Sequence, residues 1–189
     1  YPNASFFSSI SESLEHDFSG YIIATPAITH YEIAKQLMNN KKHVLIEKPM
    51  TLDSNESKML NNLALTNNVN IMVGHLLLFH PAIRKIKDLI KSNKIGKLQY
   101  IYSNRLNLGK VRTEENVFWS LAPHDVSILQ YFCESYPESI HTTGCAFLQQ
   151  DVHDTTMTVI SYPNNVKCHI YVSWLHPFKE HRLVVIGSK

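Results

Sequence analysis

The chain has 189 residues, of which 44% are hydrophobic and 18% charged, a composition that favours a folded globular protein over a disordered chain. Eighteen Lys and Arg against 16 Asp and Glu give a formal net charge of +2, which provides no electrostatic basis for a nucleic acid or anionic membrane partner. The longest apolar runs are far shorter than the ~20 residues of a membrane span, and the N-terminus lacks the regions of a signal peptide.

The first third of the chain alternates strands and helices. A helix is expected to end over residues 11–16, with Ser9 or Ser11 as its cap. Three short runs rich in β-branched residues indicate buried strands, and segments with helical spacing of apolar residues separate them. The strands are expected at 21–24, 43–46 and 70–73, and the helices at 31–39 and from Asp53 or Ser54 onward, with Met59, Leu60, Leu63 and Ala64 on the inner face.

Strands and helices that alternate with short connections predict a parallel α/β sheet. Ligands of such sheets bind beyond the carboxyl ends of the strands. The segments to search are therefore Thr25-Pro26, Glu47-Lys48-Pro49 and Gly74-His75.

From about residue 81 the pattern indicates an α+β domain with a mostly antiparallel sheet. Pro163-Asn164-Asn165 is a turn of the kind that joins a hairpin. Helices are expected at 81–90 and from near Pro123 to about Cys133, and strands at 97–107, 140–148, 155–161, 167–174 and 183–186.

The strand expected at 167–174 has two different faces. Cys168, Ile170, Val172 and Trp174 share one face, and His169, Tyr171 and Ser173 share the other. One face is expected to cover the helices of its own domain. The other, partly aromatic, is a candidate subunit interface.

The three cysteines, Cys133, Cys145 and Cys168, are widely spaced and form no C-x-x-C pattern. We interpret them as buried thiols in a reducing compartment, in preference to a disulfide or a metal role. Eleven histidines include pairs five residues apart, but no H-E-x-x-H or cysteine pair accompanies them, so no metal is expected. These features predict a cytoplasmic enzyme.

Lys48 follows the second strand in the sequence Glu47-Lys48-Pro49. An amine that is partly desolvated at a strand end can have a lowered pKa and can share a proton with a substrate hydroxyl. A trans Pro49 would hold Lys48 in an extended backbone and fix its direction. The alternative is a surface lysine that follows a strand.

Arg105 and Asn107 alternate along one strand face, so both are candidates to project into a cleft that Trp119 helps to line. Arg105 would suit a carboxylate or phosphate on a substrate. The alternative is that they are polar residues of a strand edge that face water.

Several separated motifs, in order, resemble the Gfo/Idh/MocA family of oxidoreductases, and together they cover nearly the whole chain. They are I-A-T-P-A-x-x-H at 23–30, K-H-V-L-I-E-K-P at 42–49, Gly74-His75, N-R-L-N-L-G at 104–109, W-S-L-A-P-H-D at 119–125, V-S-W at 172–174 and G-S-K at 187–189.

The resemblance implies the C-terminal part of a Rossmann-type sheet that binds NAD or NADP over residues 1–78. It implies a substrate and oligomerisation domain over 79–189, and a homo-oligomer formed through the sheet of that domain. Lys48 would contact the nicotinamide side and the reacting hydroxyl, and His124 would be the acid/base. The expected reaction is hydride transfer between the cofactor and a carbon of a sugar or nucleotide sugar.

His124 suits proton transfer because its unperturbed pKa of ~6.5 lies near the operating pH. Pro123 places it in the first turn of a helix, where the positive end of the macrodipole favours the neutral imidazole. Many relatives have Asp four residues before this histidine, where this chain has Ser120, which can bind substrate but cannot ionise. We therefore expect a different substrate class from inositol dehydrogenases, resembling that of nucleotide-sugar or surface-polysaccharide enzymes. The alternative is a non-catalytic sugar-binding or regulatory relative that uses the same cleft.

The six glycines form no G-x-G-x-x-G fingerprint, so the first β-α-β unit, which would hold the pyrophosphate, is expected to lie outside this sequence. Residues of the nicotinamide half remain: Thr25, Pro26, His30, Glu47 and Lys48. A capping role is the alternative for His30. The chain has the character of a fragment cut at both ends, and by itself it is expected to bind cofactor poorly and to be inactive.

Overall fold

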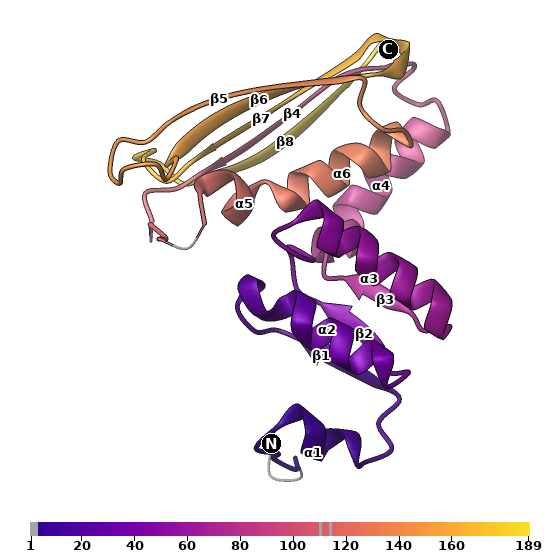
Figure 1. Cartoon of the computed structure of the whole chain (residues 1–189). Coiled ribbons are helices and arrows are strands. Elements are labelled where there is room, and N and C mark those ends of the chain that lie inside the picture. The colour runs from indigo at the N-terminus through magenta and orange to yellow at the C-terminus, as the bar shows by residue number, and fades with distance from the viewer. Residues whose placement is uncertain (1–3, 110, 114) are drawn as a thin grey trace. The chain divides into compact units, whose positions relative to one another are not determined.

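The structure is a computed structural model that describes residues 4–109, 111–113 and 115–189 (Figure 1). The chain divides into two compact units, one that ends at Gly74 and one that begins at His75. Each unit has its own buried apolar cluster.

The first unit is built on a parallel sheet of three strands in the order β1-β2-β3, as the sequence predicted. Buried Ile23, Val44 and Ile46 of the sheet belong to the same core as Leu37 and Leu60 of the helices. In chain order the elements are α1 (Ile10–Leu14), β1 (Gly20–Ile23), η1 (Ala27–Thr29), α2 (His30–Asn39), β2 (His43–Ile46), α3 (Ser54–Asn67) and β3 (Ile71–Val73).

Helix starts in this unit settle two alternatives that the sequence left open. The Ser9 side chain accepts the backbone N–H of Glu12 at 3.1 Å, so Ser9 rather than Ser11 caps α1. Asp53 caps α3 by accepting the backbone N–H groups of the second and third residues of the helix at 2.6 and 3.2 Å. These bonds satisfy amides that have no partner inside the helix.

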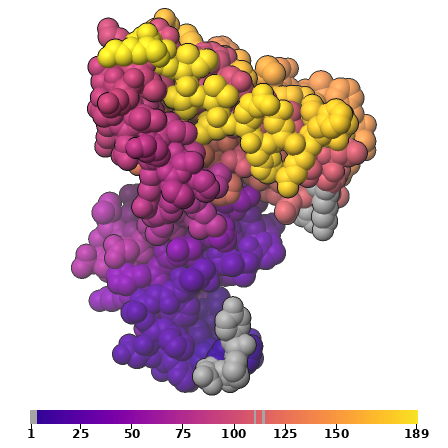
Figure 2. All heavy atoms as spheres, turned by 180° about the vertical axis from the view of Figure 1, so that it is seen from behind, coloured from indigo at the N-terminus to yellow at the C-terminus, as the bar shows by residue number. Residues whose placement is uncertain are grey.

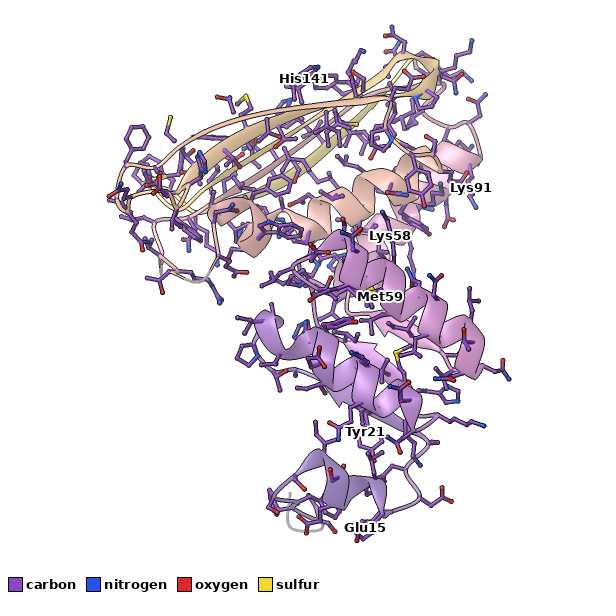
Figure 3. All side chains as sticks on the ribbon, in the orientation of Figure 1. Glu15, Tyr21, Lys58, Met59, Lys91 and His141 are labelled. Atoms are coloured by element: carbon purple, nitrogen blue, oxygen red, sulfur yellow. The ribbon has the colours of Figure 1, made fainter. Side chains whose placement is uncertain are left out.

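The inner face of α3 is narrower than its sequence pattern predicted. Leu60 and Ala64 are buried, but Met59 is 55% exposed. One residue turns an α-helix by about 100°, so a stripe centred on Leu60 and Ala64 leaves Met59 at its margin. Met59, labelled on α3 in Figure 3, accepts a hydrogen bond through its sulfur from the Tyr31 hydroxyl of α2 at 3.6 Å.

The second unit is an α+β arrangement around a five-stranded sheet in the order β5-β6-β7-β4-β8. Only the β4–β7 pair is parallel, so the prediction of a mostly antiparallel sheet is confirmed. The elements are η2 (Leu76–Phe79), α4 (Pro81–Lys91), β4 (Leu98–Leu106), α5 (Val117–Leu121), α6 (Pro123–Cys133), β5 (Ser139–Cys145), β6 (Thr155–Tyr162), η3 (Pro163–Asn165), β7 (Val166–Ser173) and β8 (Glu180–Gly187). Helices α4, α5 and α6 lie on one face of this sheet (Figure 1), and part of the C-terminal segment is visible at the surface in Figure 2.

The alternation of β7 is as predicted. Cys168, Ile170 and Val172 are fully buried, and they share one core with Leu129 and Phe132 of α6. The turn before β7 is also confirmed, because η3 joins β6 to β7 as an antiparallel hairpin, with Asn164 and Asn165 at φ of 61° and 60°. Asparagine is one of the few residues other than glycine that adopts this backbone readily.

Three features of this unit differ from the sequence predictions. Helix α5 was not expected as a separate element, and β5 ends at Cys145 rather than at residue 148. Of the three free thiols only Cys168 is buried, whereas Cys133 is half-buried and Cys145 is exposed. The expectation that all three are buried is wrong because β5 is an edge strand with few neighbours.

Candidate active site

In the first unit the predicted residues follow the carboxyl ends of the strands. Thr25 and Pro26 come after β1, are exposed, and lead into η1. The Thr25 and Thr29 hydroxyls are 2.7 Å apart, and the Thr29 hydroxyl also donates to the Pro26 carbonyl at 2.8 Å. These bonds within the turn give the segment after β1 a defined local structure.

His30 connects two of these strand ends. Its buried ring places Nδ1 2.8 Å from the Pro49 carbonyl oxygen and Nε2 2.9 Å from the Thr25 carbonyl oxygen. Both partners are acceptors, so a neutral imidazole donates to one of them and lies in contact with the other. The His30 ring thus packs between the segment after β1 and the segment after β2, beside Lys48.

The E-K-P segment follows β2 and faces the end of β3. A Cβ atom added at Gly74 would lie 3.2–3.3 Å from the carboxyl atoms of Glu47, so glycine lets the Glu47 side chain lie close to the backbone of the next strand end. The Gly74 N–H donates to the Ile46 carbonyl at 2.7 Å. Lys48 as a whole residue is half-buried.

The peptide bond between Lys48 and Pro49 is cis, which corrects the expectation of a trans proline. X-Pro bonds have only a weak preference for trans, and sequence alone does not show which form the surrounding structure selects.

In the second unit, His124 is the second residue of α6, directly after Pro123 in its first turn. Its ring lies beside that of His75, with centroids 6.4 Å apart and planes at 80°. Burial lowers the pKa of His75, and its buried Nδ1 has no hydrogen-bond partner among the residues that the structure describes. In the sequence, Gly74-His75 stands out both as a segment that follows a strand and as one of the ordered family motifs, but neither signal assigns His75 a role.

Asp125, adjacent to His124, is directed into the sheet. It accepts the Arg105 Nε–H at 2.5 Å and the Ser103 hydroxyl at 2.7 Å, and only 1% of the residue is exposed. Burial raises the pKa of the Asp125 carboxyl, and the charge and hydrogen bond of Arg105 oppose that rise. The ion pair joins the first turn of α6 to β4.

A pocket of about 380 Å³ lies where α4 and α6 meet β4 and β8. Leu77, Ile83 and Ile128 contribute apolar lining, and Arg105 and His181 contribute polar lining. Of the four predicted substrate residues other than His124, the structure brings only Arg105 to this pocket.

The other three predicted substrate residues lie elsewhere in the unit. Asn107 follows β4 and donates its backbone N–H to the Ser173 carbonyl at 3.0 Å. Trp119 is partly exposed and Ser120 is buried, both on α5. Because α5 ends at Leu121 and α6 begins at Pro123, the four-residue interval between Ser120 and His124 spans two helices and is not a helical pair.

Within residues 4–109, 111–113 and 115–189, no group of three or more His, Cys, Asp or Glu side chains has an arrangement that could hold a metal ion. Over the same residues, none of the helices combines the length and apolar character needed to cross a bilayer.

The two units define a Rossmann-type oxidoreductase domain followed by an α+β domain. Residues 1–75 match the family model described as "Oxidoreductase family, NAD-binding Rossmann fold", and residues 83–189 match the one described as "GFO/IDH/MocA C-terminal domain". The chain belongs to the Gfo/Idh/MocA family of oxidoreductases. The predictions of family and fold are thus confirmed, and the description of the first match confirms NAD as the cofactor type of the family.

Similar proteins include sugar dehydrogenases. UDP-N-acetylglucosamine 3-dehydrogenase of Acidithiobacillus ferrooxidans is 30% identical over 125 residues, which cover 66% of this chain and 39% of that protein. Its structure superposes with a TM-score of 0.86 at 25% identity and covers 96% of this chain and 59% of that one. The scyllo-inositol 2-dehydrogenase (NAD+) of Bacillus subtilis is 27% identical over 180 residues, 89% of this chain and 52% of that protein. The chain spans about half the length, or less, of these curated relatives.

A further solved structure supports the fold alone. GenD2 from gentamicin A biosynthesis, in complex with NAD, superposes with a TM-score of 0.90 at 21% identity and covers 98% of this chain and 57% of that one.

Proposed function

We propose that this protein is an NAD(P)-dependent oxidoreductase that transfers a hydride between the nicotinamide cofactor and a CH–OH or keto carbon of a sugar or nucleotide sugar. The observation that supports this most is the placement of His124 in the first turn of α6, beside a second imidazole. In this proposal residues 1–78 supply the cofactor side and residues 79–189 supply the substrate side and the oligomer contacts.

The cofactor side fits a nicotinamide. Thr25 and Pro26 are exposed after β1, His30 holds that segment to the segment after β2, and Gly74 leaves room for the Glu47 carboxylate. The cofactor, when bound, accepts or supplies the hydride at nicotinamide C4. Thr25, Pro26, His30, Glu47 and Lys48 are proposed to bind and orient that ring.

The proton of the reacting hydroxyl is assigned to His124 and Lys48. Oxidation of an alcohol carbon to a ketone releases one hydride and one proton, and neutral His124 takes up that proton at its imidazole. Lys48 donates a hydrogen bond to the same oxygen and limits the charge that develops on it.

The substrate class rests on the relatives and on Ser120. The similar proteins include dehydrogenases of UDP-N-acetylglucosamine and of scyllo-inositol. Ser120 occupies the position where many relatives carry Asp, which favours the nucleotide-sugar type. Arg105, Asn107, Trp119 and Ser120 are proposed as substrate contacts together with His124.

Turnover measurements on the complete protein test this proposal. Lys48→Ala and His124→Ala should each lower the turnover number about a hundredfold or more, as expected for the loss of a proton-transfer group. Lys58→Ala on the exposed side of α3 (Figure 3) and His153→Ala in a surface loop are matched controls and should retain wild-type rates. Wild-type turnover in both Lys48→Ala and His124→Ala would remove these residues from the mechanism. Sugar binding without any turnover in the wild type would favour a binding module.

The homo-oligomer is proposed to form through the face of the second sheet that carries His169 and Tyr171. On the same side of β6, Met157 and Val159 are 43% and 44% exposed, which is unusual for apolar residues in the middle of a strand. Val159→Glu should lower the assembly state in sedimentation velocity experiments, whereas Leu65→Glu on α3 should not. An assembly state unchanged by Val159→Glu would place the interface elsewhere. A cytoplasmic location is part of the proposal, because free thiols suit a reducing compartment.

A further inference from the structure

A second imidazole lies beside His124 within the second unit. The ring centroids of His75 and His124 are 6.4 Å apart and the ring planes meet at 80°, an edge-to-face arrangement within the range of favourable aromatic contacts. The backbone of His75 is fixed at the start of η2, because its carbonyl accepts the Leu78 N–H at 3.0 Å. The two rings are thus held beside each other by the packing of η2 on α6.

The His75 ring has a buried nitrogen that is not satisfied within the protein. Over the part of the chain that the structure describes, His75 Nδ1 has no hydrogen-bond partner. Burial lowers the pKa of His75, so the ring is neutral at pH 7. A neutral imidazole always has one nitrogen that accepts a hydrogen bond. Buried polar atoms without a partner are rare in folded proteins, and they often mark a functional contact.

The carboxylate next to His124 in the chain is engaged elsewhere. A base that takes up a proton is commonly oriented by a third group, most often a carboxylate. Asp125 does not serve here, because it accepts the Arg105 Nε–H and the Ser103 hydroxyl on the sheet side of α6. Ionisable side chains on η2 and α4 also have partners of their own: His80 caps α4 through the Ala82 N–H, Arg84 lies over the Phe79 ring, and Lys87 pairs with Glu134.

We propose that His75 is a positioning residue for His124, whose neutral imidazole accepts a hydrogen bond from the His124 imidazolium that forms when the substrate proton is taken up. This inference rests on the proposed role of His124 as the base. An imidazolium has an N–H at both nitrogens, so one remains with the substrate oxygen while the other donates to His75. Such hydrogen bonds are often long in an unliganded site and shorten in the substrate complex. The contact stabilises the charged form of His124 and fixes the direction of its ring.

Nitrogen NMR of the imidazoles in the complete protein, without substrate, tests the pair directly. His75→Phe keeps a flat ring but removes the acceptor, so the pH midpoint of the His124 titration should fall by about one unit. His75→Gln keeps an acceptor in its amide oxygen and should restore most of that shift. His75→Lys should lower the midpoint by about one to two units, as expected for two positive charges 6.4 Å apart at an effective dielectric constant of ~20.

Turnover measurements separate this role from a structural one. His75→Phe should lower kcat about tenfold with KM unchanged, and His75→Gln should remain within about threefold of the wild type. A residue needed only for packing would give the opposite order, because Phe fills the space of the ring whereas Gln buries an amide there. Leu76→Phe is the matched control on η2, since Leu76 is 61% exposed, and it should retain the wild-type kcat.

Thermal unfolding checks that the variants fold. His75→Phe should unfold at no lower temperature than the wild type, because it removes a buried nitrogen that has no partner. A lowered kcat in this variant then reports on His124 and not on misfolding.

Two results would overturn the proposal. One is an identical His124 titration in the wild type and His75→Phe, which would show that His75 accepts nothing from His124. The other is wild-type kcat in His75→Phe together with a lowered kcat in His75→Gln, which would assign His75 to packing. Because the titration needs no substrate, a wild type without turnover would count against the proposed function, while the titration would still decide whether the two imidazoles interact.

Discussion

Replacing Arg105 by Met should destabilise the second unit strongly, because it leaves the Asp125 carboxylate buried without its cation. Asp125 is 1% exposed and Arg105 contributes the shortest of its hydrogen bonds, at 2.5 Å. Removing one partner of a buried ion pair costs ~3–5 kcal/mol, and we expect the lower end because the Arg105 side chain retains some contact with water.

The stability difference between the wild type and Arg105→Met should depend on pH, because burial raises the pKa of Asp125 above its ordinary value of 3.8. Loss of Arg105 removes the two largest effects that oppose this rise, its charge and its hydrogen bond, so the folded-state pKa of Asp125 should increase further. A carboxyl with a raised folded pKa contributes stability that is fully present below its unfolded pKa and is lost as the pH rises through the folded pKa. The stability gap between the wild type and Arg105→Met should therefore widen from pH 5 to pH 8.

Urea unfolding followed by tryptophan fluorescence measures this gap. Both tryptophans of the chain, Trp119 and Trp174, lie in the second unit, and Trp174 is buried in its core. With a slope of ~1–3 kcal/mol per molar urea, a loss of ~3 kcal/mol lowers the midpoint by about 1–3 M. Arg182→Met is the control, because its ion pair with Glu180 at 3.4 Å is exposed and should contribute less than ~1 kcal/mol.

Two further variants complete a double-mutant cycle. Asp125→Asn should cost less than Arg105→Met, since it retains a polar partner for Ser103 and removes the buried charge. The double variant should regain part of the stability that Arg105→Met loses. A gap that does not change with pH, or a double variant no more stable than Arg105→Met, would refute this account of the ion pair.

Two predictions concern histidines. His30→Ala should lower the stability of the first unit by about 2–3 kcal/mol, because the buried ring is lost from between the Thr25 and Pro49 carbonyls and at least one of them loses its hydrogen-bond donor. Hydrogen exchange should accelerate across this unit but not across the second, and unchanged protection would contradict the prediction. Burial lowers the pKa of His169, so its contribution to stability is present above its ordinary pKa of 6.5 and is lost as the pH falls through the lowered value. The thermal midpoint of His169→Phe should thus fall less between pH 8 and pH 5 than that of the wild type, with exposed His141→Phe (Figure 3) as the control; parallel curves would exclude this effect.

Elements with a strong local pattern could be predicted from the sequence. The three parallel strands follow from short apolar runs rich in β-branched residues, the buried face of β7 from period-two alternation, and the hairpin turn at Asn164 from turn residues with special backbone preferences. The five-residue helix α5 was missed because so short a segment shows little more than one turn of periodicity. Strand ends were misplaced where pairing with a neighbour, rather than composition, sets the limit.

The site was harder to predict because its contacts join distant parts of the chain. Sequence motifs identified Lys48 and His124 as candidates, but no local pattern pairs His75 with His124 or Arg105 with Asp125. The ion pair connects a strand to a helix 20 residues later, and such a pairing depends on how α6 packs on β4. The cis form of the Lys48–Pro49 bond is likewise set by its surroundings.

The position of β4 in its sheet has a consequence for the order of folding. This strand precedes the other four in the chain, yet it lies between β7 and β8. Their residues follow their β4 partners by 67 positions in Tyr100↔Lys167 (167 − 100) and by 89 in Leu98↔Gly187 (187 − 98). The hairpins β5–β6 and β6–β7 close short loops and can form early, whereas β4 must wait for distant partners. During synthesis on the ribosome, β4 would be the first strand of this sheet to emerge and among the last to form its pairs.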